Sequence, residues 1–562
     1  MKKNLFLLLI PSILFSSPYG GTLYISTISD PKSFNGIISK ESSTGEAIGF
    51  LFEGLTDRDG VTTEIRPCLA KSWDYSKDGK VWRFHLREDV KWFDGKPFTA
   101  DDVVFTYNSL IYNDDIPTSS RDVLTIDGEK LVVEKVSTYT VQFTLPKPFA
   151  PLLHQLGQAI FPKHILEKAV KEKAFSSTWG VDTAPQKIIG TGPFIMTEYR
   201  PAERIVYKRN PNYWKKDKKG NGLPYIEKIV MLIVSDQQAQ LASFEAGETD
   251  ILSVMGKDYA YLKNKEAKGR FTLANYGSGF GSNFLSFNQN KLAVKQPKLA
   301  WFSDISFRKA VAHSIDKEAI IKNVMLGFGF SQASAMEEAA KFFYNPNVVQ
   351  YEYDLEKAKK ILEKAGYIDR NKDGIREDAK GNPIKFTLIT NAENNTRRDI
   401  GVIISEDLKK LGFNVGFAPI DFNKLVNMLT SSCDWDAMLI GLTGGIEPHS
   451  GKNVWESTGE LHFWNPEPGN EEKKKAWKEG LSLWEKEIDT IFNKGAGELQ
   501  EKKRKAFYDK WQVIVSQQLP LIYTVNPATL YAIRDKFIGM KPTAYGGCLH
   551  NLEEISIKPK WR

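Results

Sequence analysis

Apolar and polar side chains alternate along several short stretches in the first third of the chain. The clearest are residues 21–28 and Val81–Arg87, and two further stretches are Val141–Leu145 and Ile205–Lys208. Alternation with a period of two is typical of strands that bury one face. Thr99 precedes Asp101 and Asp102 and a helical apolar face, which predicts a capped helix. This region is therefore predicted to form a mixed α/β lobe.

Beyond about residue 350 the pattern changes to helix followed by strand. Asp354 is the predicted cap of a helix that ends at Gly366. A strand at Ile384–Thr390, a helix at Ile400–Leu411 and a strand at Phe413–Phe417 follow. This order is a βαβ unit and predicts parallel pairing of the two strands.

The first residues have the features of a secretory signal peptide. Lys2 and Lys3 precede an apolar run from Leu5 to Phe15, and small polar residues follow. The run is too short to span a membrane, and no later stretch of that length lacks charge. We therefore expect residues 1–17 to be removed and the mature chain to be soluble. Since no cysteine follows the run closely, we expect a free periplasmic protein rather than a lipoprotein.

Length and composition narrow the class of protein further. A chain of 562 residues is longer than one hydrophobic core supports, so two or three domains are expected. The formal net charge of +7 includes Lys2 and Lys3, and is too mild to indicate a nucleic-acid partner. Cys68, Cys433 and Cys548 lack metal-ligand spacing, and one disulfide with one free thiol remains an alternative.

Several strings occur in an order and spacing that resemble one known family. They are Phe52–Leu55, Pro67–Trp73, Trp82–Arg87, Trp92–Val103, Gly190–Phe194, Arg209–Trp214, Phe307–Ala310, Ser314–Lys317 and Ala358–Gly366. Together they resemble the family 5 solute-binding proteins, the peptide, dipeptide and nickel branch of ABC-importer receptors. Most of the aromatic residues in these strings are expected to pack in the core, and Arg308 to hold a helix.

The resemblance implies an α/β fold of the periplasmic binding protein type II, in its large three-segment form. Two lobes with mixed β-sheets would close over a ligand at a hinge. It implies that lobe I comprises residues 18–50, 190–275 and 515–562, with a small extra domain at 51–189, and that lobe II comprises residues 276–514. It also implies a monomeric receptor without cofactor or catalysis. Such a receptor would bind a peptide or similar solute through main-chain hydrogen bonds and deliver it to permease subunits with a separate ATPase.

The resemblance also indicates which segments line the cleft. In the large lobe these are Gly441, Leu442, Thr443, Gly444, Gly445, Glu447 and Trp455, after the pair Trp435-Asp436. On the opposing side the candidates are Ser29, Asp30, Tyr276 and Asn283. Peptide-binding relatives usually carry an acidic residue near Gly444 that pairs with the α-amino group of the peptide. This chain has none there, so either Glu447 takes the role or the ligand presents no ammonium group.

Four alternatives stay open at this stage. Glu447 and His449 could hold a metal, which would make the chain a receptor for nickel or a metal chelate. Asp369, Asn371 and Asp373 imitate a calcium loop, although Lys380 stands where a bidentate Glu is required. A secreted enzyme is disfavoured because no Gly-x-Ser-x-Gly or His-Glu-x-x-His motif occurs. An adhesin, or a sensor for a signalling partner, would keep the fold and change the role.

Overall fold

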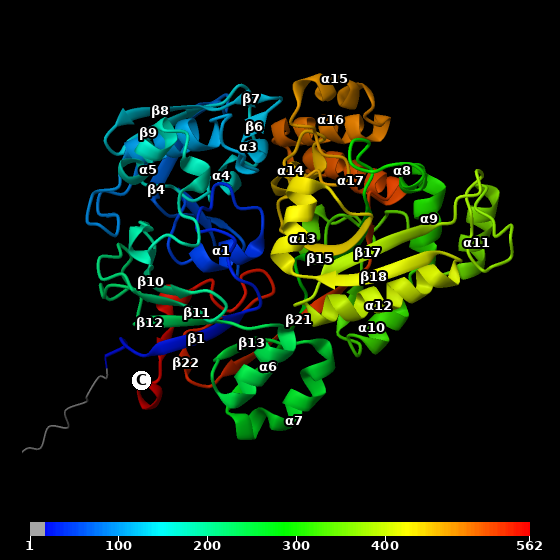
Figure 1. The fold of residues 1–562 in the computed structure, drawn as a ribbon. Helices are drawn as coiled ribbons and strands as arrows, with labels where there is room; N and C mark the ends of the chain where they lie inside the picture. Colours follow the sequence, from blue (N-terminus) through cyan, green and yellow to red (C-terminus); the bar gives the residue numbers. More distant parts are fainter. Residues whose placement is uncertain (1–16) are drawn as a thin grey trace, which may run out of the picture.

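The computed structural model describes residues 17–562, so nearly all of the predicted signal peptide lies outside the described residues. The first sheet has the order β1-β12-β11-β10 (Figure 1). Its strands are β1 (Thr22–Thr27), β12 (Lys228–Ile233), β11 (Arg204–Arg209) and β10 (Phe194–Arg200). β1 pairs with β12 in parallel, which brings residues two hundred positions apart into one lobe. Within residues 17–562 no helix combines the length and the apolar character needed to cross a bilayer.

A four-stranded antiparallel sheet forms the core of a smaller domain on this lobe. Its order is β4 (Ala70–Tyr75), β5 (Val81–Leu86), β9 (Thr140–Thr144) and β8 (Val132–Ser137). Helices α2 (Ala100–Val104), α3 (Ser120–Val123), α4 (Leu152–Gln155) and α5 (Lys163–Lys171) accompany it. The predicted cap is confirmed, because Thr99 and Asp102 form a reciprocal capping box. Phe84, Trp92 and Phe98 are fully buried, as expected for core aromatics.

The second lobe is built on a five-stranded mixed sheet. Its order is β18 (Asn414–Ile420), β17 (Lys385–Asn391), β19 (Ala437–Thr443), β15 (Gly281–Phe287) and β20 (Leu521–Tyr523). β17 runs parallel to β18 and β19, which confirms the predicted βαβ unit. β15 runs antiparallel to β19 and β20. The carboxyl ends of β17 and β19 and the start of β15 therefore share one edge of the sheet.

Helices surround this sheet in Figure 1. They are α8 (Lys298–Ser303), α9 (Ile305–Ser314), α10 (Lys317–Asn323), α11 (Leu355–Lys364), α12 (Asn395–Lys410), α13 (Phe422–Asn427), α14 (Lys452–Trp455), α15 (Glu471–Glu479), α16 (Leu483–Gly497) and α17 (Glu501–Gln518). The Asp354 side chain caps α11, as predicted. α12 begins at Asn395 rather than at the predicted Ile400, because Asn394 accepts a hydrogen bond from the Arg397 amide. Arg308 donates to main-chain carbonyls, which confirms its structural role.

A small sheet joins the two lobes. β21 (Val525–Arg534) lies between β13 (Ile251–Ser253) and β14 (Phe271–Ser278), and its first residues also pair with β16 (Gly329–Ser331). Helices α6 (Gln237–Ala246) and α7 (Tyr259–Gly269) lie beside it in Figure 1. The chain crosses between the lobes twice, from β14 to β15 and from β20 to β21. The predicted boundary at residue 515 is therefore too early, because β20 still belongs to the sheet of lobe II.

One further α-helix and six short strands occur in the described chain. They are α1 (Ser42–Ile48), β2 (Thr56–Arg58), β3 (Ile65–Pro67), β6 (Thr125–Ile126), β7 (Glu129–Lys130), β22 (Phe537–Ile538) and β23 (Ser556–Ile557). The thiols of all three cysteines are free, so no disulfide links these elements.

The two lobes contact each other directly. The Lys40 ammonium lies 2.5 Å from the Glu460 carboxylate across the cleft. Lys452, which is fully buried, donates to the Thr125 carbonyl at 2.9 Å. In Figure 1 the region of α14 faces the small domain near α3. The structure therefore represents a closed arrangement of the lobes.

Candidate functional site

A cavity of about 460 Å³, here called the cleft cavity, lies between the two lobes. Lobe I contributes the end of β1 and part of α1. Lobe II contributes the shared edge of β15, β17 and β19 with the first residues of α12. The small sheet that joins the lobes contributes a third wall through residues of β13 and β21. The polar residues that line the cavity include Thr27, Ser29, Ser42, Ser43, Glu46, Gln237, Ser282, Asn283, Asn391, Asn394, Thr396, Arg397 and Thr443.

Five of the predicted site residues line this cavity. They are Ser29, Asn283, Gly441, Leu442 and Thr443. The three from 441 to 443 form the carboxyl end of β19, opposite the first residues of β15. In open α/β sheets ligands bind in the crevice outside the carboxyl ends of the strands. The fold therefore brings these five residues to a position suited to a ligand.

Glu447 is engaged elsewhere and does not line the cavity. Arg504 of α17 donates from Nη1 to Glu447 Oε2 at 3.0 Å, and its second nitrogen donates to Oε1. Both side chains are buried. A bidentate guanidinium pair already satisfies this carboxylate, so pairing it with a ligand ammonium would leave Arg504 uncompensated. Glu447 is therefore not placed to pair with the α-amino group of a peptide, the role that the sequence analysis offered for it.

Trp455 and Asp30 also face away from the cavity. Trp455 is 5% exposed and packs with its ring centroid 5.6 Å from Trp464 and 5.2 Å from Trp511. Asp30 accepts hydrogen bonds from the Tyr199 hydroxyl at 2.8 Å and the Ala202 amide at 3.1 Å. Trp455 therefore belongs to the core of lobe II, and the Asp30 side chain orders a turn of lobe I.

Gly444 and Gly445 follow β19 directly and differ in their surroundings. A Cβ atom on Gly444 would overlap the Phe280 carbonyl and the Glu337 carboxylate, whereas one on Gly445 would meet nothing within 4 Å. Glu337 is 5% exposed, and burial raises the pKa of its carboxyl to about 7. The acidic side chain nearest to Gly444 is thus Glu337, which comes from a distant part of the sequence.

Tyr276 is not among the residues that line the cleft cavity or the second space beside it. Its ring centroid is 5.9 Å from that of Tyr531, and Tyr531 lines both spaces together with Glu46 and Ser253. The second space, here called the lobe I cavity, has a volume of about 820 Å³. The two cavities share these three lining residues and are therefore neighbours.

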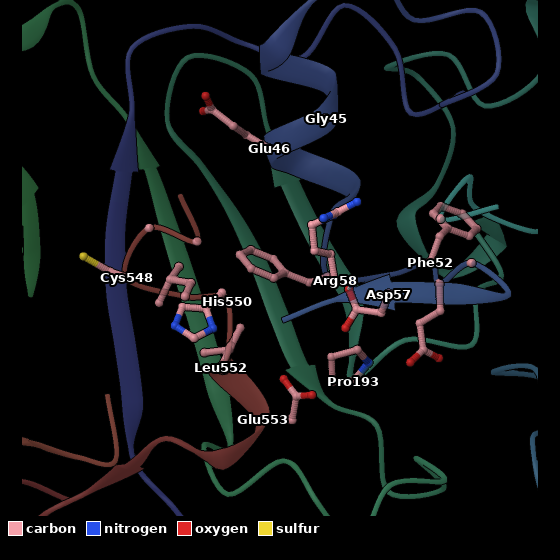
Figure 2. Close-up of a pocket in the computed structure, with 18 of the residues that line it drawn as sticks. Gly45, Glu46, Phe52, Asp57, Arg58, Pro193, Cys548, His550, Leu552 and Glu553 are labelled. Atoms are coloured by element: carbon pink, nitrogen blue, oxygen red, sulfur yellow. Dashed lines mark hydrogen bonds between the residues drawn. The ribbon is translucent and has the colours of Figure 1, made fainter. Parts of the chain in front are cut away.

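The lobe I cavity is rich in charge, and many of its charges pair with each other. Figure 2 shows Arg58, His550 and Glu553 around it. Arg66 lies 2.6 Å from Asp57, and Lys215 lies 2.6 Å from Glu553. The remaining acidic, basic and histidine residues that line it are Glu46, Glu53, Arg58, His154 and His550. Much of this charge is therefore balanced within the protein.

Two buried groups in the lobe I cavity are held by hydrogen bonds. Glu53 accepts from the Tyr213 hydroxyl at 2.8 Å and from Trp214 Nε1, while burial raises the pKa of its carboxyl. Burial also lowers the pKa of His154 to about 4, so its imidazole is neutral at neutral pH. These groups fix the shape of the cavity wall.

Sequence reasoning missed Arg397, the cation of the cleft cavity. It donates from Nε to Asn283 Oδ1 at 2.9 Å and from Nη1 to Asn391 Oδ1 at 2.8 Å. The sequence carries a signal for it, because Arg397 lies between the predicted strand at Ile384–Thr390 and the predicted helix at Ile400–Leu411. The crevice at the carboxyl ends of such strands is the expected ligand position in an α/β sheet. Glu46 and Arg58 carried no such signal, since tertiary contacts alone bring them to a cavity.

The arrangement does not favour a metal at Glu447 and His449. His449 is fully buried, and its Nε2 lies 3.1 Å from the Val123 carbonyl of the small domain. Burial also lowers the pKa of His449. Because Arg504 occupies the Glu447 carboxylate, these two side chains stabilise contacts inside the protein and leave no open coordination site.

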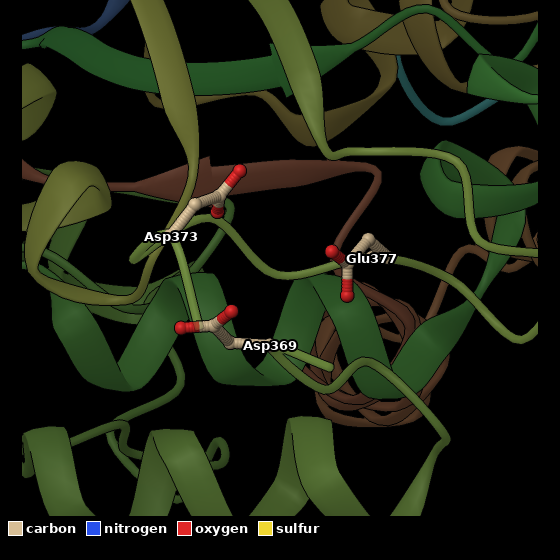
Figure 3. A group of neighbouring side chains, drawn as sticks. All are labelled: Asp369, Asp373 and Glu377. Carbon is tan, nitrogen blue, oxygen red and sulfur yellow. The ribbon is translucent and has the colours of Figure 1, made fainter. Parts of the chain in front are cut away.

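A separate group of carboxylates lies in the loop after α11 (Figure 3). Oxygen atoms of Asp369, Asp373 and Glu377 lie within 4.8 Å of one another. Glu377 supplies the third carboxylate in place of the predicted Asn371, whose side chain instead donates to Asp373 at 3.0 Å. One oxygen of Asp369 is buried without a hydrogen-bond partner. Calcium at this loop stays a prediction.

Comparisons with known proteins place these features in a family context. Residues 64–460 match the family described as bacterial extracellular solute-binding proteins, family 5 Middle. A probable ABC transporter-binding protein of Deinococcus radiodurans is 30% identical over 539 residues, which cover 92% of this chain and 89% of that protein. The dipeptide-binding protein of Escherichia coli is 25% identical over 571 residues, which cover 98% and 97%.

A solved structure extends the likeness to the fold. The oligopeptide-binding protein AppA of Bacillus subtilis, in complex with a nonapeptide, superposes with a TM-score of 0.80 at 25% identity. The match covers 96% of this chain and 99% of that chain. The two-lobed binding-protein fold predicted from the sequence is therefore confirmed.

We predict that Gly444→Ala lowers the free energy of unfolding by about 1–3 kcal/mol, because the added methyl group overlaps a carbonyl and a carboxylate. Gly445→Ala is the matched control and should change it by less than about 0.5 kcal/mol. Urea unfolding followed by tryptophan fluorescence measures both. Equal effects of the two substitutions would contradict the packing described at Gly444.

We predict that Glu337 makes the protein less stable as the pH rises from 4.5 to 7. Its carboxyl has an ordinary pKa of 4.5 when unfolded and about 7 when folded, so the folded state binds more protons in this window. The loss amounts to roughly 3 kcal/mol at most. Unfolding free energies across this range should slope less for Glu337→Gln than for wild type. Glu338→Gln, at an exposed neighbour, should keep the wild-type slope.

We predict that millimolar Ca²⁺ raises the melting temperature after treatment with EDTA, since three carboxylates at one point attract a hard cation. Asp373→Asn should abolish the rise, and Asp74→Asn, in the small domain, should retain it. Mg²⁺ at the same concentration should act weakly, because it demands stricter octahedral geometry. An unchanged melting temperature at 10 mM Ca²⁺, on the order of ten times the weakest extracellular affinities, would refute the site.

Proposed function

Since the chain belongs to the family 5 bacterial extracellular solute-binding proteins, we propose that it captures short peptides and delivers them to an ABC importer. Membership makes the protein a solute-binding receptor rather than an enzyme. The peptide as ligand is our proposal. It is supported by the likeness to AppA and to the dipeptide-binding protein of Escherichia coli.

The observation that carries the proposal is the composition of the cleft cavity. Its walls come from both lobes and from the strands that join them, and they expose hydroxyl, amide and main-chain groups. Gly281 stands at the start of β15, where the absence of a side chain lets a ligand approach the backbone. A peptide main chain offers donors and acceptors that suit such walls.

Closure of the lobes is the proposed means of capture. A ligand that contacts both lobes stabilises the closed arrangement. The stabilisation equals the free energy of the contacts that the ligand makes only when the lobes are closed. The contacts of Lys40 with Glu460 and of Lys452 with Thr125 would then form each time the cleft closes. An ion pair near the surface contributes at most about 1 kcal/mol, so Lys40 with Glu460 alone would not hold the lobes closed.

The cellular setting is proposed from the sequence. The features of residues 1–17 support export to the periplasm. The permease subunits and the ATPase would be separate chains, and the receptor would act as a monomer. A sensor role would keep the same cleft, and adjacent permease and ATPase genes would favour import over sensing.

We predict that the protein as purified carries peptides and is indifferent to N-terminal acetylation of added ones. Gly444 and Gly445 supply no anion, and Arg504 already occupies Glu447. Native mass spectrometry, with mass analysis of what denaturation releases, tests the first point. Thermal shift with trialanine and N-acetyl-trialanine tests the second, since a hundredfold excess over the dissociation constant stabilises by about 2.7 kcal/mol.

The two measurements test peptide capture and recognition of the free α-amino group separately. Release of only non-peptide solutes, with no response to either peptide, would contradict peptide capture. A strong preference for the free amine would instead indicate a carboxylate partner. Glu337→Gln and Glu447→Gln would then identify it, because only the side chain that binds the ammonium should remove the preference.

A further inference from the structure

Glu46 is an acidic side chain in the wall of the cleft cavity, and no cation of the described residues pairs with it. The Thr27 hydroxyl donates to its Oε2 at 2.8 Å, which is the single hydrogen bond that the carboxylate makes within residues 17–562. The surrounding protein excludes water and raises the pKa of this carboxyl, and the bond from Thr27 offsets only part of the rise. Part of the side chain nevertheless stays open to the cavity that it lines.

The other carboxylates that line the two cavities have partners inside the protein. Asp57 and Glu553 each lie 2.6 Å from a basic side chain. Glu53 accepts from a tyrosine hydroxyl and from an indole N–H. Taking a carboxylate out of bulk water is costly, and proteins usually supply a counter-ion or several donors. Glu46 departs from this rule, because one neutral hydroxyl is its only donor.

The basic side chains that line the two cavities are occupied elsewhere. Arg66 and Lys215 pair with the carboxylates just described. Arg58 donates to a main-chain carbonyl and contacts a histidine ring. Arg397, on the opposite lobe, donates to two asparagine side chains. A cation brought by the solute would therefore find the Glu46 carboxylate free.

Glu46 lies where the two cavities meet. Glu46, Ser253 and Tyr531 line both of them, and these three residues are here called the junction. Figure 2 shows the Glu46 carboxylate extending from α1 on the side away from Arg58. Gly45, the preceding residue of α1, also lines the lobe I cavity, and a Cβ atom there would meet nothing within 4 Å. The helix therefore leaves open space beside the carboxylate.

Ser43 is a second polar group of α1 that lacks a partner near the junction. It precedes Glu46 by three residues in the helix, which puts the two side chains on the same face. Ser43 is 4% exposed and lines the cleft cavity, and its hydroxyl has no hydrogen-bond partner among the described residues. An ammonium or guanidinium group carries several N–H donors and no acceptor, so it suits a carboxylate with a hydroxyl beside it.

We propose that the junction binds a basic side chain of the captured solute with Glu46 as its counter-ion, so that the receptor prefers peptides that contain lysine or arginine. This inference rests on the proposed peptide-binding function and names the side chain that the cleft selects. The long stem of such a residue lets its charged head reach the junction while the peptide main chain stays in the cleft cavity. The Tyr531 ring offers an apolar surface for that stem. An apolar side chain in the same place would take further water from Glu46 and supply no charge in return.

The test uses isothermal titration calorimetry with trialanine that carries one lysine at each position in turn, and with the same peptides carrying norleucine. Norleucine keeps the stem of lysine without the ammonium group, and every peptide keeps its free α-amino group. The wild type should bind at least one lysine peptide roughly 10- to 100-fold more tightly than its norleucine counterpart, the scale of a charge-assisted hydrogen bond. Glu46→Gln should lose this preference, and Glu46→Asp should keep a reduced part of it.

Glu227→Gln is the matched control, because Glu227 is an exposed acid of lobe I that lines neither cavity. It should keep the wild-type preference. Wild type that binds each lysine peptide and its norleucine counterpart equally would overturn this inference and leave peptide capture standing. A lysine preference that Glu46→Gln retains would also overturn it, since another group would then be the counter-ion. Wild type that binds none of the peptides would overturn peptide capture and this inference together. The wild-type comparison needs no variant, so it decides even if Glu46→Gln does not fold.

Discussion

Asn283 holds together the two segments by which the chain crosses from one lobe to the other. Its main-chain amide donates to the Asn526 side chain at 3.1 Å. Its carbonyl accepts from Thr524, and its side-chain amide donates to the Val525 carbonyl. Every opening or closing motion must pass through these two crossings. The cleft cavity, the sheet edge and the contacts between the lobes are all positioned relative to this point.

The two crossings also determine where the groups that line the cleft cavity lie. The same edge of the lobe II sheet presents strand ends, a helix start and Arg397 to the cleft, while lobe I presents Ser29 and Glu46 from the other side. Lobe contacts such as His449 with Val123 lie away from this edge, so they can close the cleft without occupying it. A receptor of this kind separates the groups that recognise a solute from the groups that hold the lobes shut.

Much of the fold could be predicted from the sequence, because its signals are local. Alternation indicated β1 and β5, and caps at Thr99 and Asp354 indicated where α2 and α11 begin. The site was harder, because long-range contacts determine it. The resemblance indicates that residues 441–443 lie at the cleft, but nothing near Glu447 in the sequence indicates that Arg504 binds it. Arg397 could be recognised only from two signals taken together. It lies near the start of a helix, and the carboxyl ends of parallel strands are where α/β sheets bind ligands.

The central claim is that a solute is enclosed between two lobes that close on it. Small-angle X-ray scattering tests this most directly, on protein freed of solute by partial unfolding and dialysis and then mixed with a saturating pool of short peptides. The account predicts that the radius of gyration falls on addition of peptide and that the scattering curve then matches the closed structure described here. An unchanged radius of gyration, with binding shown in the same sample by calorimetry, would contradict capture by lobe closure.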